Sequence, residues 1–445
     1  MTTAPVEPST STGYLPGSSG YRRVMVAMFA AGLATFMLLY STQALLPAFV
    51  DEFGVTPTQS TLTISLTTAA LAVALLVAGP ISEVVGRTRL IHLSLWASVV
   101  VALGAALAPN WGSLVALRVV AGFALAGLPA VATAYLREEL HPRAAAGAVG
   151  LYIGGTAMGG MAGRLATAPI NDIAGWRWAL ACVAVAALAC AVVVALWLPA
   201  SRNFVGTPRS PGRLAATTRA VLADRALVAL YALGATSVGS LVAVLNALGF
   251  RLTADPWFLS LGVISLVYLV YPLGSVSSIV AGRFADRIDR REIIPVGLVL
   301  GLLGIALTAF GSLPLIISGV ALLTIGFFCM HSLASGWVTV RAHALGASTG
   351  QAASFYLFTY YVGSSLFGNL GATAWSHGGW DGVALLAAAL LLVSGAMIAV
   401  LRRTRPPAGY VGPGAVSPSA ASAEPDQPRR GGNGTKTETR RTTSA

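Results

Sequence analysis

Two arginines and one histidine lie well inside, rather than at the ends of, apolar stretches of the chain that are long enough to cross a lipid bilayer. A charged side chain in such a stretch is costly and therefore points to a function. Arg118 and Arg164 are both expected toward the same end of their stretches, near Tyr40 and Gln43. For Arg118 we favour a place in a binding site. For Arg164, extension of the side chain to the lipid headgroups is an equal alternative.

The acidic residues are absent from these stretches, because all sixteen fall in the connecting segments or tails. No carboxylate is therefore predicted in mid-membrane to bind a cation or carry a proton. His331 is the histidine in the middle of a stretch, and an imidazole titrates near neutrality, although such a residue can also be a packed polar group. The alternative proton carrier is Asp51 or Glu52, whose carboxylate would compete with the solute for binding to Arg118. Further cavity candidates, for which packing is an equal interpretation, are Asn246, Tyr268, Tyr356, Tyr360 and Tyr361.

A short charged pattern occurs twice. In each copy a glycine (Gly79, Gly282) is followed four positions later by an acid and eight positions later by an arginine, and the two copies are 203 residues apart. Gly122-Phe123 and Gly326-Phe327 repeat at an offset of 204. A repeat of this length predicts two copies of one structural unit, in the same orientation. The acids and arginines of the pattern are Glu83 with Arg87, and Asp286 with Arg290; Gly86 precedes Arg87.

Composition predicts the elements that hold these residues. The chain of 445 residues is 56% hydrophobic and 10% charged, which is far too apolar for a soluble protein of this length. In lipid the backbone can satisfy its hydrogen bonds only as helices or closed barrels, and apolar runs of ~20 residues are helices. The sequence predicts an all-α polytopic membrane protein with twelve transmembrane helices in two pseudo-symmetric six-helix halves.

The predicted organisation follows from where the apolar runs stop. Arginines concentrate in the segments after even-numbered spans, so both termini are expected in the cytoplasm. The net charge of +12 resides in those segments and the tail, and it does not indicate a nucleic-acid partner. The predicted divisions are a disordered N-terminal tail (1–20), the first six-helix half (21–198), a cytoplasmic linker (199–224), the second half (225–405) and a disordered basic C-terminal tail (406–445).

The stretches Gly79–Arg89 and Gly282–Arg291 resemble the paired signature loops of the major facilitator superfamily, in its drug/proton-antiporter-like branch. Glu83 stands where the family usually has aspartate. The resemblance implies a gate latch, in which Glu83 contacts the N-terminus of span 11, where Ser348-x-x-Gln351 predicts a capping box. Asp286 would face the start of span 5 at Pro142. The alternative is a pair of turns whose arginines only set the topology.

Two further stretches carry the resemblance. Arg118-x3-Gly122 resembles the span 4 signature of proton-coupled exporters, and the glycines of span 5 match part of the glycine-rich antiporter motif, with Arg164 where a final glycine is usual. Small residues four apart let helices approach closely in lipid. We expect a seam between spans 5 and 8 on which the halves rock, with ordinary helix packing as the alternative. The seam residues are Gly155, Gly159, Gly163, Gly274 and Ser278.

These features predict a secondary active transporter that works by alternating access, with proton-coupled efflux of a sugar, an organic anion or a drug-like compound. The buried cations and missing carboxylate favour an anionic or hydrogen-bonding solute. An importer or symporter on the same fold, and a receptor-like protein that moves no solute, are the alternatives. An enzyme is not expected, because no nucleotide loop, metal cluster or nucleophile–base pair is visible. We expect no cofactor, and as partners a small solute, protons and the bilayer of the cytoplasmic membrane, with the protein as a monomer.

Overall fold

The computed structural model describes residues 13–204 and 218–404, and within these ranges the chain is helical with a single isolated backbone bridge. Apolar runs in lipid form helices because each helix satisfies its own backbone. The helices are α1 (Ser19–Tyr40), η1 (Gln43–Leu45), α2 (Leu46–Phe53), α3 (Pro57–Ser60), α4 (Leu62–Val85), α5 (Arg87–Ala106), α6 (Trp111–Leu125), α7 (Gly127–Glu139), α8 (Pro142–Ala174), α9 (Trp176–Trp197), α11 (Arg225–Thr253), α12 (Leu261–Ser265), η2 (Leu266–Val270), α13 (Tyr271–Ala285), α14 (Arg290–Thr308), α15 (Leu313–Ala344) and α16 (Thr349–Arg403).

Ten helical segments of the described ranges are long and apolar enough to cross a membrane. α16 counts once among them, although Gly379, with φ 55° and ψ −147°, divides its 55 residues into two helices. α8 is not among the ten, but its 33 residues exceed the ~20 that a bilayer requires. With α8 added and α16 divided, the described helices give the twelve crossings that the sequence predicts.

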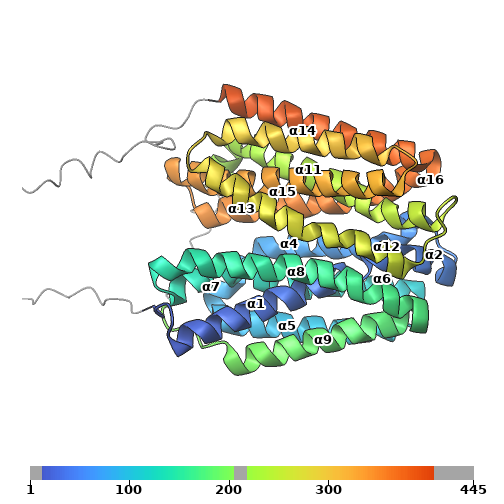
Figure 1. Ribbon diagram of the computed structural model, residues 1–445. Helices are drawn as coiled ribbons and strands as arrows, with labels where there is room; N and C mark the ends of the chain where they lie inside the picture. Colours follow the sequence, from blue (N-terminus) through green and yellow to red (C-terminus); the bar gives the residue numbers. More distant parts are fainter. Residues whose placement is uncertain (1–12, 205–217, 405–445) are drawn as a thin grey trace, which may run out of the picture.

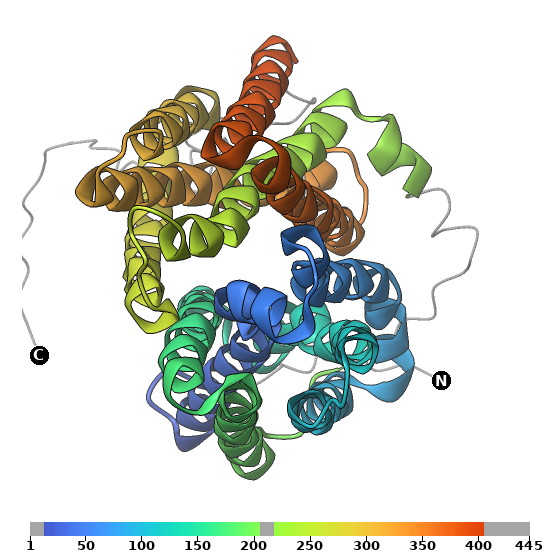
Figure 2. The ribbon, with the colours of Figure 1, turned by 90° about the vertical axis from the view of Figure 1, so that its right-hand side faces the viewer.

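The helices gather into two bundles, one from the first part of the chain and one from the second (Figure 2). Each bundle has its own apolar core: one large cluster is built mostly from residues between Val24 and Leu198, and another mostly from residues between Val221 and Leu401. Both ends of the described chain lie at the same end of the molecule (Figure 1). An even number of crossings requires this arrangement.

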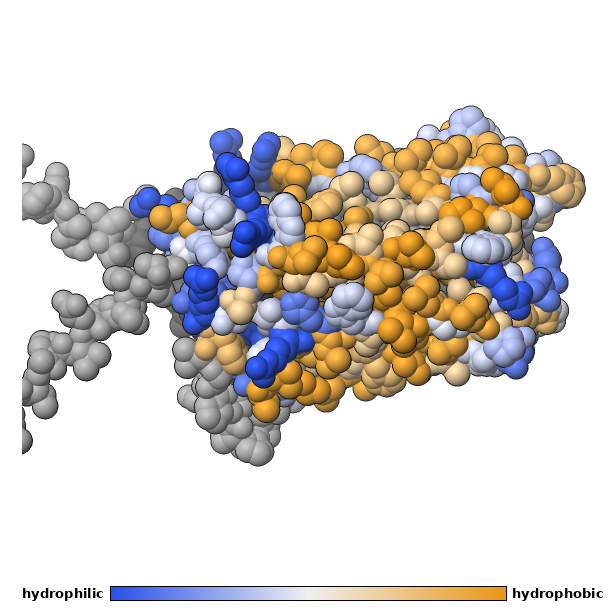
Figure 3. Space-filling model, turned by 90° about the horizontal axis from the view of Figure 1, so that it is seen from below, coloured by the Kyte–Doolittle hydropathy of each residue, from blue (hydrophilic) through white to orange (hydrophobic). Residues whose placement is uncertain are grey.

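The surface carries a broad apolar belt between two hydrophilic ends (Figure 3). Large apolar side chains on α5, α9, α14 and the second part of α16 are exposed, among them Val100, Val185, Val299 and Leu392. α1 and α11 are instead the most enclosed of the candidate spans. The polar residues in the middle of these helices, such as Thr35 of α1 and Ser240 and Asn246 of α11, are therefore buried against other helices.

Some residues of the predicted N-terminal tail and linker are ordered parts of the fold. The Tyr14 N–H donates to the Glu139 carbonyl (2.9 Å), and α1 begins at Ser19 with the Ser18 hydroxyl as its N-cap. Residues 218–223 are helical, and Val221 is buried in the second core. The predicted disorder is thus wrong for residues 13–20. The remaining parts of the predicted tails and linker, residues 1–12, 205–217 and 405–445, lie outside the described residues.

Glycines determine how closely the central helices approach. A Cβ atom on Gly159 would overlap the Leu33 carbonyl of α1, and one on Gly363 would overlap the Ala235 carbonyl of α11. Each half thus presses its fifth span onto its first in the same way, as the repeat predicts.

The predicted contact between spans 5 and 8 is present, because α8 packs against α12, η2 and α13 of the other half, but the small residues named for this seam do not line it. Gly155, Gly159 and Gly163 pack against the α1 backbone at Phe29, Leu33 and Met37. Gly274 faces the Phe328 ring of α15, and the Ser278 hydroxyl donates to the Phe328 carbonyl at 3.3 Å. These small residues close gaps within each half, because close backbone approach stabilises any helix pair in lipid.

Candidate functional site

Hydrogen bonds join the two halves toward the end of the molecule away from the chain ends. We call this the distal end; it contains α2, α12 and the C-terminal end of α8 (Figure 1), together with η1 and α3, which flank α2 in the sequence. The hydroxyls of Thr58 and Thr373 lie 3.2 Å apart, and Asn369 Nδ2 donates to Thr61 Oγ1 at 2.8 Å. The Gly262 N–H donates to Asp172 Oδ2 at 2.7 Å. These contacts hold the halves together at the distal end.

A buried polar network lies between the halves, farther from the distal end than these contacts. Gln43 Nε2 donates to Asn246 Oδ1 at 2.5 Å, and Asn246 Nδ2 donates to the Gly368 carbonyl at 3.1 Å. Arg164 Nε donates to Gln43 Oε1 at 2.5 Å. Gln43, Asn246 and Arg164 are each at most 2% exposed. The sequence predicted all three as pathway residues, and the structure brings them together.

Arg164 is surrounded by tyrosine rings. Its Cζ lies 4.1 Å from the centre of the Tyr40 ring, 4.7 Å from Tyr271 and 5.1 Å from Tyr268. Nη1 donates to the Gly160 carbonyl at 2.7 Å, whereas Nη2 has no hydrogen-bond partner. We call Tyr40, Gln43, Tyr268 and Tyr271 the Arg164 cage. No carboxylate of the described residues pairs with Arg164, and its complete burial excludes extension to the headgroups in this conformation.

Arg118 has a different environment. Nε donates to the Thr63 carbonyl at 2.9 Å, Nη1 to the Leu38 carbonyl at 3.1 Å and Nη2 to the Leu39 carbonyl at 2.8 Å. The guanidinium therefore binds backbone groups at the end of α1 and the start of α4, next to Tyr40 in sequence. The structure supports a positioning role for Arg118 within the first half, and it places Arg164 at the meeting of the halves.

His331 lies in an aromatic group on α15 and α16. His331 Nδ1 lies 2.9 Å from the Tyr356 hydroxyl, and its ring centre is 4.9 Å from that of Tyr360 and 5.5 Å from that of Phe327. The Phe327 ring centre lies 5.1 Å from that of Phe328, which in turn lies 6.0 Å from that of Tyr271. A line of aromatic rings thus connects the His331 region with the Arg164 cage.

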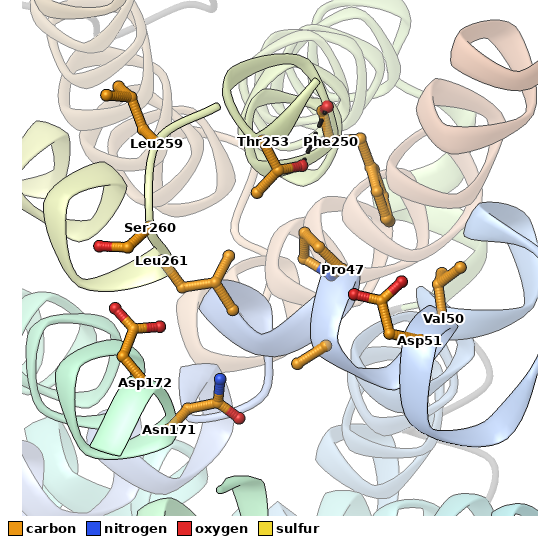
Figure 4. Close-up of a pocket in the computed structure, with 11 residues that line it drawn as sticks. Pro47, Val50, Asp51, Asn171, Asp172, Phe250, Thr253, Leu259, Ser260 and Leu261 are labelled. Atoms are coloured by element: carbon orange, nitrogen blue, oxygen red, sulfur yellow. Dashed lines mark hydrogen bonds between the residues drawn. The ribbon is translucent and has the colours of Figure 1, made fainter. Parts of the chain in front are cut away.

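A pocket of about 340 Å³ opens at the distal end and is lined by residues of both halves (Figure 4). Pro47 and Phe250 line it, one helical turn beyond Gln43 and Asn246, and Asn171 lines it two turns beyond Arg164. Asp51 and Asp172 point into the region between the halves there (Figure 4). Asp51 therefore lines the pocket, while Glu52 forms an exposed ion pair with Arg177 at 3.2 Å.

At the opposite end, the first signature segment is the last turn of α4 and the start of α5. Gly86, with φ +92°, makes the turn, and Gly79 lies one turn before Glu83 within α4. Arg87 Nη2 lies 2.9 Å from Glu83 and 3.1 Å from Glu138 of α7. Arg87 also donates to the Ser82 hydroxyl. This ion-pair cluster connects three helices of the first half.

The second segment ends α13 and begins α14. Gly282 and Asp286 are exposed, and Arg290 is the first residue of α14, capped by Asp289. Ser348 caps α16 by accepting the Gln351 N–H at 3.3 Å, and Pro142 begins α8, as the sequence predicts. Contacts of Glu83 with the start of α16, and of Asp286 with the start of α8, stay predictions.

Two members of the site were missed by the sequence reasoning. Tyr271 lies one turn beyond Tyr268, which was named as a cavity residue, so a search at helical spacing would have found it. Gly368 lies 204 residues after Arg164, which is the offset of the internal repeat. The repeat could therefore have identified Gly368 as the position equivalent to Arg164.

Comparison with known proteins places this chain. The family model described as Major Facilitator Superfamily matches residues 24–368 and 259–426. The chain is 40% identical to the inner membrane transport protein YnfM of Escherichia coli, with 85% of this chain and 90% of YnfM covered. It is 38% identical to the MFS-type transporter YybF of Bacillus subtilis, with 85% and 93% covered. A solved structure of a bacterial homologue of the human lysosomal transporter Spinster, in an inward-facing and occupied conformation, has a TM-score of 0.70 at 15% identity, with 87% of this chain and 98% of that one covered.

Proposed function

Because the chain belongs to the major facilitator superfamily and is a membrane transporter rather than an enzyme, we propose that it exports a small solute in exchange for protons, by alternating access. The protein acts as a monomer in the cytoplasmic membrane. Both termini are cytoplasmic, and the distal end faces outward. The arginine-rich loops at the other end support this orientation, and the name of YnfM as an inner membrane protein supports the location.

The observation that carries the proposal is the buried network of Gln43, Asn246 and Arg164, which joins the halves under the distal pocket. A polar network of this kind in the membrane is expensive and marks a solute pathway. Its place beneath the contacts of Thr58 and Asp172 supports a conformation that is closed to the outside. Alternating access then requires these contacts to break when the distal end opens.

The direction of transport and the coupling ion rest on three features. Arg118-x3-Gly122 and the glycines of span 5 resemble exporter motifs, which supports efflux. His331 is the proposed proton carrier, because it is a titratable side chain deep in the bundle, bound to the Tyr356 hydroxyl. In the outward-open state, Glu83 and Asp286 hold the starts of α16 and α8, where unpaired N–H groups favour an anion.

Inverted membrane vesicles test this function. Respiration makes the vesicle interior acidic, and an internal pH dye reports proton release when a solute is added outside. Four solutes sample the chemical classes: glucose, benzenesulfonate, benzenesulfonamide and trimethylphenylammonium. Vesicles without the protein are the control. We expect one class to raise the internal pH, and His331→Gln to abolish this response. No response to any class, despite binding to the purified protein, would contradict proton-coupled export.

A further inference from the structure

Arg164 carries a donor that nothing in the described protein uses. Nε and Nη1 bind the neutral oxygens of Gln43 and Gly160, while Nη2 is buried without a partner. The side chain is 0% exposed. Buried polar groups are hydrogen-bonded in the great majority of cases, so an unused guanidinium N–H calls for an explanation.

The charge of Arg164 is also uncompensated. A buried cation is normally paired with an acid, yet the groups around Arg164 are the Gln43 amide, the Gly160 carbonyl and three tyrosine rings. The rings attract a cation through their faces, which offsets part of the desolvation. They offer no negative charge, and the hydroxyls of the three tyrosines make no hydrogen bond within the described residues. The cage is therefore one negative charge short of a balanced site.

We propose that the acidic group of the transported solute binds Arg164 Nη2, so that the solute class is a small organic anion with a flat, apolar body. This inference rests on the proposed function and names the substrate class of the same site. A guanidinium presents its N–H groups in a fork that matches an acidic group of two or three oxygens. The rings of Tyr40, Tyr268 and Tyr271 surround the guanidinium and give the bound acidic group an aromatic, apolar neighbourhood.

Other solute classes fit the cage less well. A cation would meet the positive charge of Arg164 in a low-dielectric site, where repulsion is strong. A neutral sugar could accept from Nη2 but would leave the charge unbalanced. Aromatic rings continue from Tyr271 through Phe328 and Phe327 to His331, which suits a body of one or two rings.

A matched set of three probes tests the inference on the purified full-length protein by titration calorimetry. Benzenesulfonate, benzenesulfonamide and trimethylphenylammonium carry a permanent negative charge, no charge and a permanent positive charge on the same ring. We expect benzenesulfonate to bind about ten- to hundredfold more tightly than benzenesulfonamide, as a hydrogen bond to a charged group implies. Trimethylphenylammonium should bind least. This series needs no variant.

Variants assign the preference to Arg164. Arg164→Gln should lose the preference for benzenesulfonate, and Arg164→Lys should keep part of it, because the charge remains while the fork is lost. Arg177→Gln is the matched control, since it removes the same charge from an exposed site at the distal end, and it should bind as the unaltered protein does.

Two results would overturn the inference: equal binding of the three probes, or a preference for the anion that survives in Arg164→Gln. Its failure can be distinguished from failure of the proposed function. If benzenesulfonate binds through Arg164 but no solute moves protons in vesicles, the anion site stands and proton-coupled export fails. If glucose or trimethylphenylammonium moves protons and benzenesulfonate does not bind, export stands and the anion site fails.

Discussion

Gln43 and Asn246 are equivalent positions of the internal repeat, 203 residues apart, and they hydrogen-bond to each other at 2.5 Å. Equivalent positions of two related halves can touch only near the axis that relates them. Arg164 and Gly368 are also equivalent positions of the repeat, and each binds one member of the amide pair. Arg164 donates to Gln43, and the Gly368 carbonyl accepts from Asn246. The first half thus places a cation where the second half has only backbone.

The amide pair should hold the distal end closed. Asn246→Leu leaves the Gln43 amide buried without its acceptor, which costs about 1–3 kcal/mol in the closed state. We expect a larger share of molecules with the distal end open. Spin labels on Ile173 and Gly311, in a background without the native cysteines, would report a longer distance. Asn171→Leu is the control, because its side chain lines the pocket without joining the network; an equal shift in both variants would contradict this role.

The two buried arginines should differ in their effect on stability. Arg118→Gln leaves the Thr63, Leu38 and Leu39 carbonyls without their donors, and each hydrogen bond to a charged group contributes about 1.5–3 kcal/mol. We expect a clear fall in the thermal unfolding midpoint in detergent. Arg164→Gln should lower it much less, because it also removes an uncompensated buried charge. Equal losses in the two variants would contradict the different environments of the two guanidinium groups.

Close packing of α8 on α1 should tolerate no added methyl group. Gly159→Ala places Cβ on the Leu33 carbonyl, whereas Gly154→Ala, on the same helix, meets nothing within 4 Å. Overpacking of this kind costs about 1–3 kcal/mol. Gly159→Ala should lower the unfolding midpoint, and Gly154→Ala should leave it unchanged or raise it slightly, since alanine is the better helix former.

The fold was predictable because apolar length and the repeat offset are strong signals. The twelve crossings follow from runs such as Trp176–Trp197, and the pairing of the halves follows from the offset between Gly79 and Gly282. The polar residues of the site were also predictable, because an amide or a charged side chain is conspicuous in an apolar run, as Gln43, Asn246 and Arg164 are.

The partners of these residues were not predictable in the same way. The small residues of α8 and α13 fit any close helix pair, so spacing alone could not say that Gly159 meets Leu33 rather than the second half. The roles of Arg118 and Arg164 depend on whether carbonyls or tyrosine rings surround each guanidinium. These surroundings depend on how each helix is rotated about its own axis, which the spacing of residues along the sequence does not determine.

An ion pair near the start of α11 should give a pH-dependent contribution to stability. Asp224 caps α11 through the Leu227 N–H (2.8 Å) and binds Arg341 of α15 (2.6 Å). Burial acts to raise the pKa of Asp224, but Arg341 and the helix N–H groups outweigh it, so the pKa lies below its ordinary value. The contribution of the ionised carboxylate is therefore complete above the unfolded pKa of about 3.9 and is lost as the pH falls through the folded pKa.

Asp224→Asn measures this contribution. We expect the free energy of unfolding to fall by about 2 kcal/mol near pH 7. Below about pH 4 the difference from the unaltered protein should be smaller. Thermal unfolding at a series of pH values measures both. A difference that is the same at pH 7 and pH 3 would contradict the assignment to the Asp224–Arg341 pair.

Opening of the distal end is the central claim, and a reversible cross-link tests it most directly. The hydroxyls of Thr58 and Thr373 lie 3.2 Å apart across the two halves, so a Thr58→Cys, Thr373→Cys protein without Cys182, Cys190 and Cys329 can form a disulfide there. In the vesicle assay, with the solute class that responds, oxidation should abolish proton release and dithiothreitol should restore it, while each single-cysteine protein stays active throughout. Full proton release by the cross-linked protein would contradict transport through the distal end.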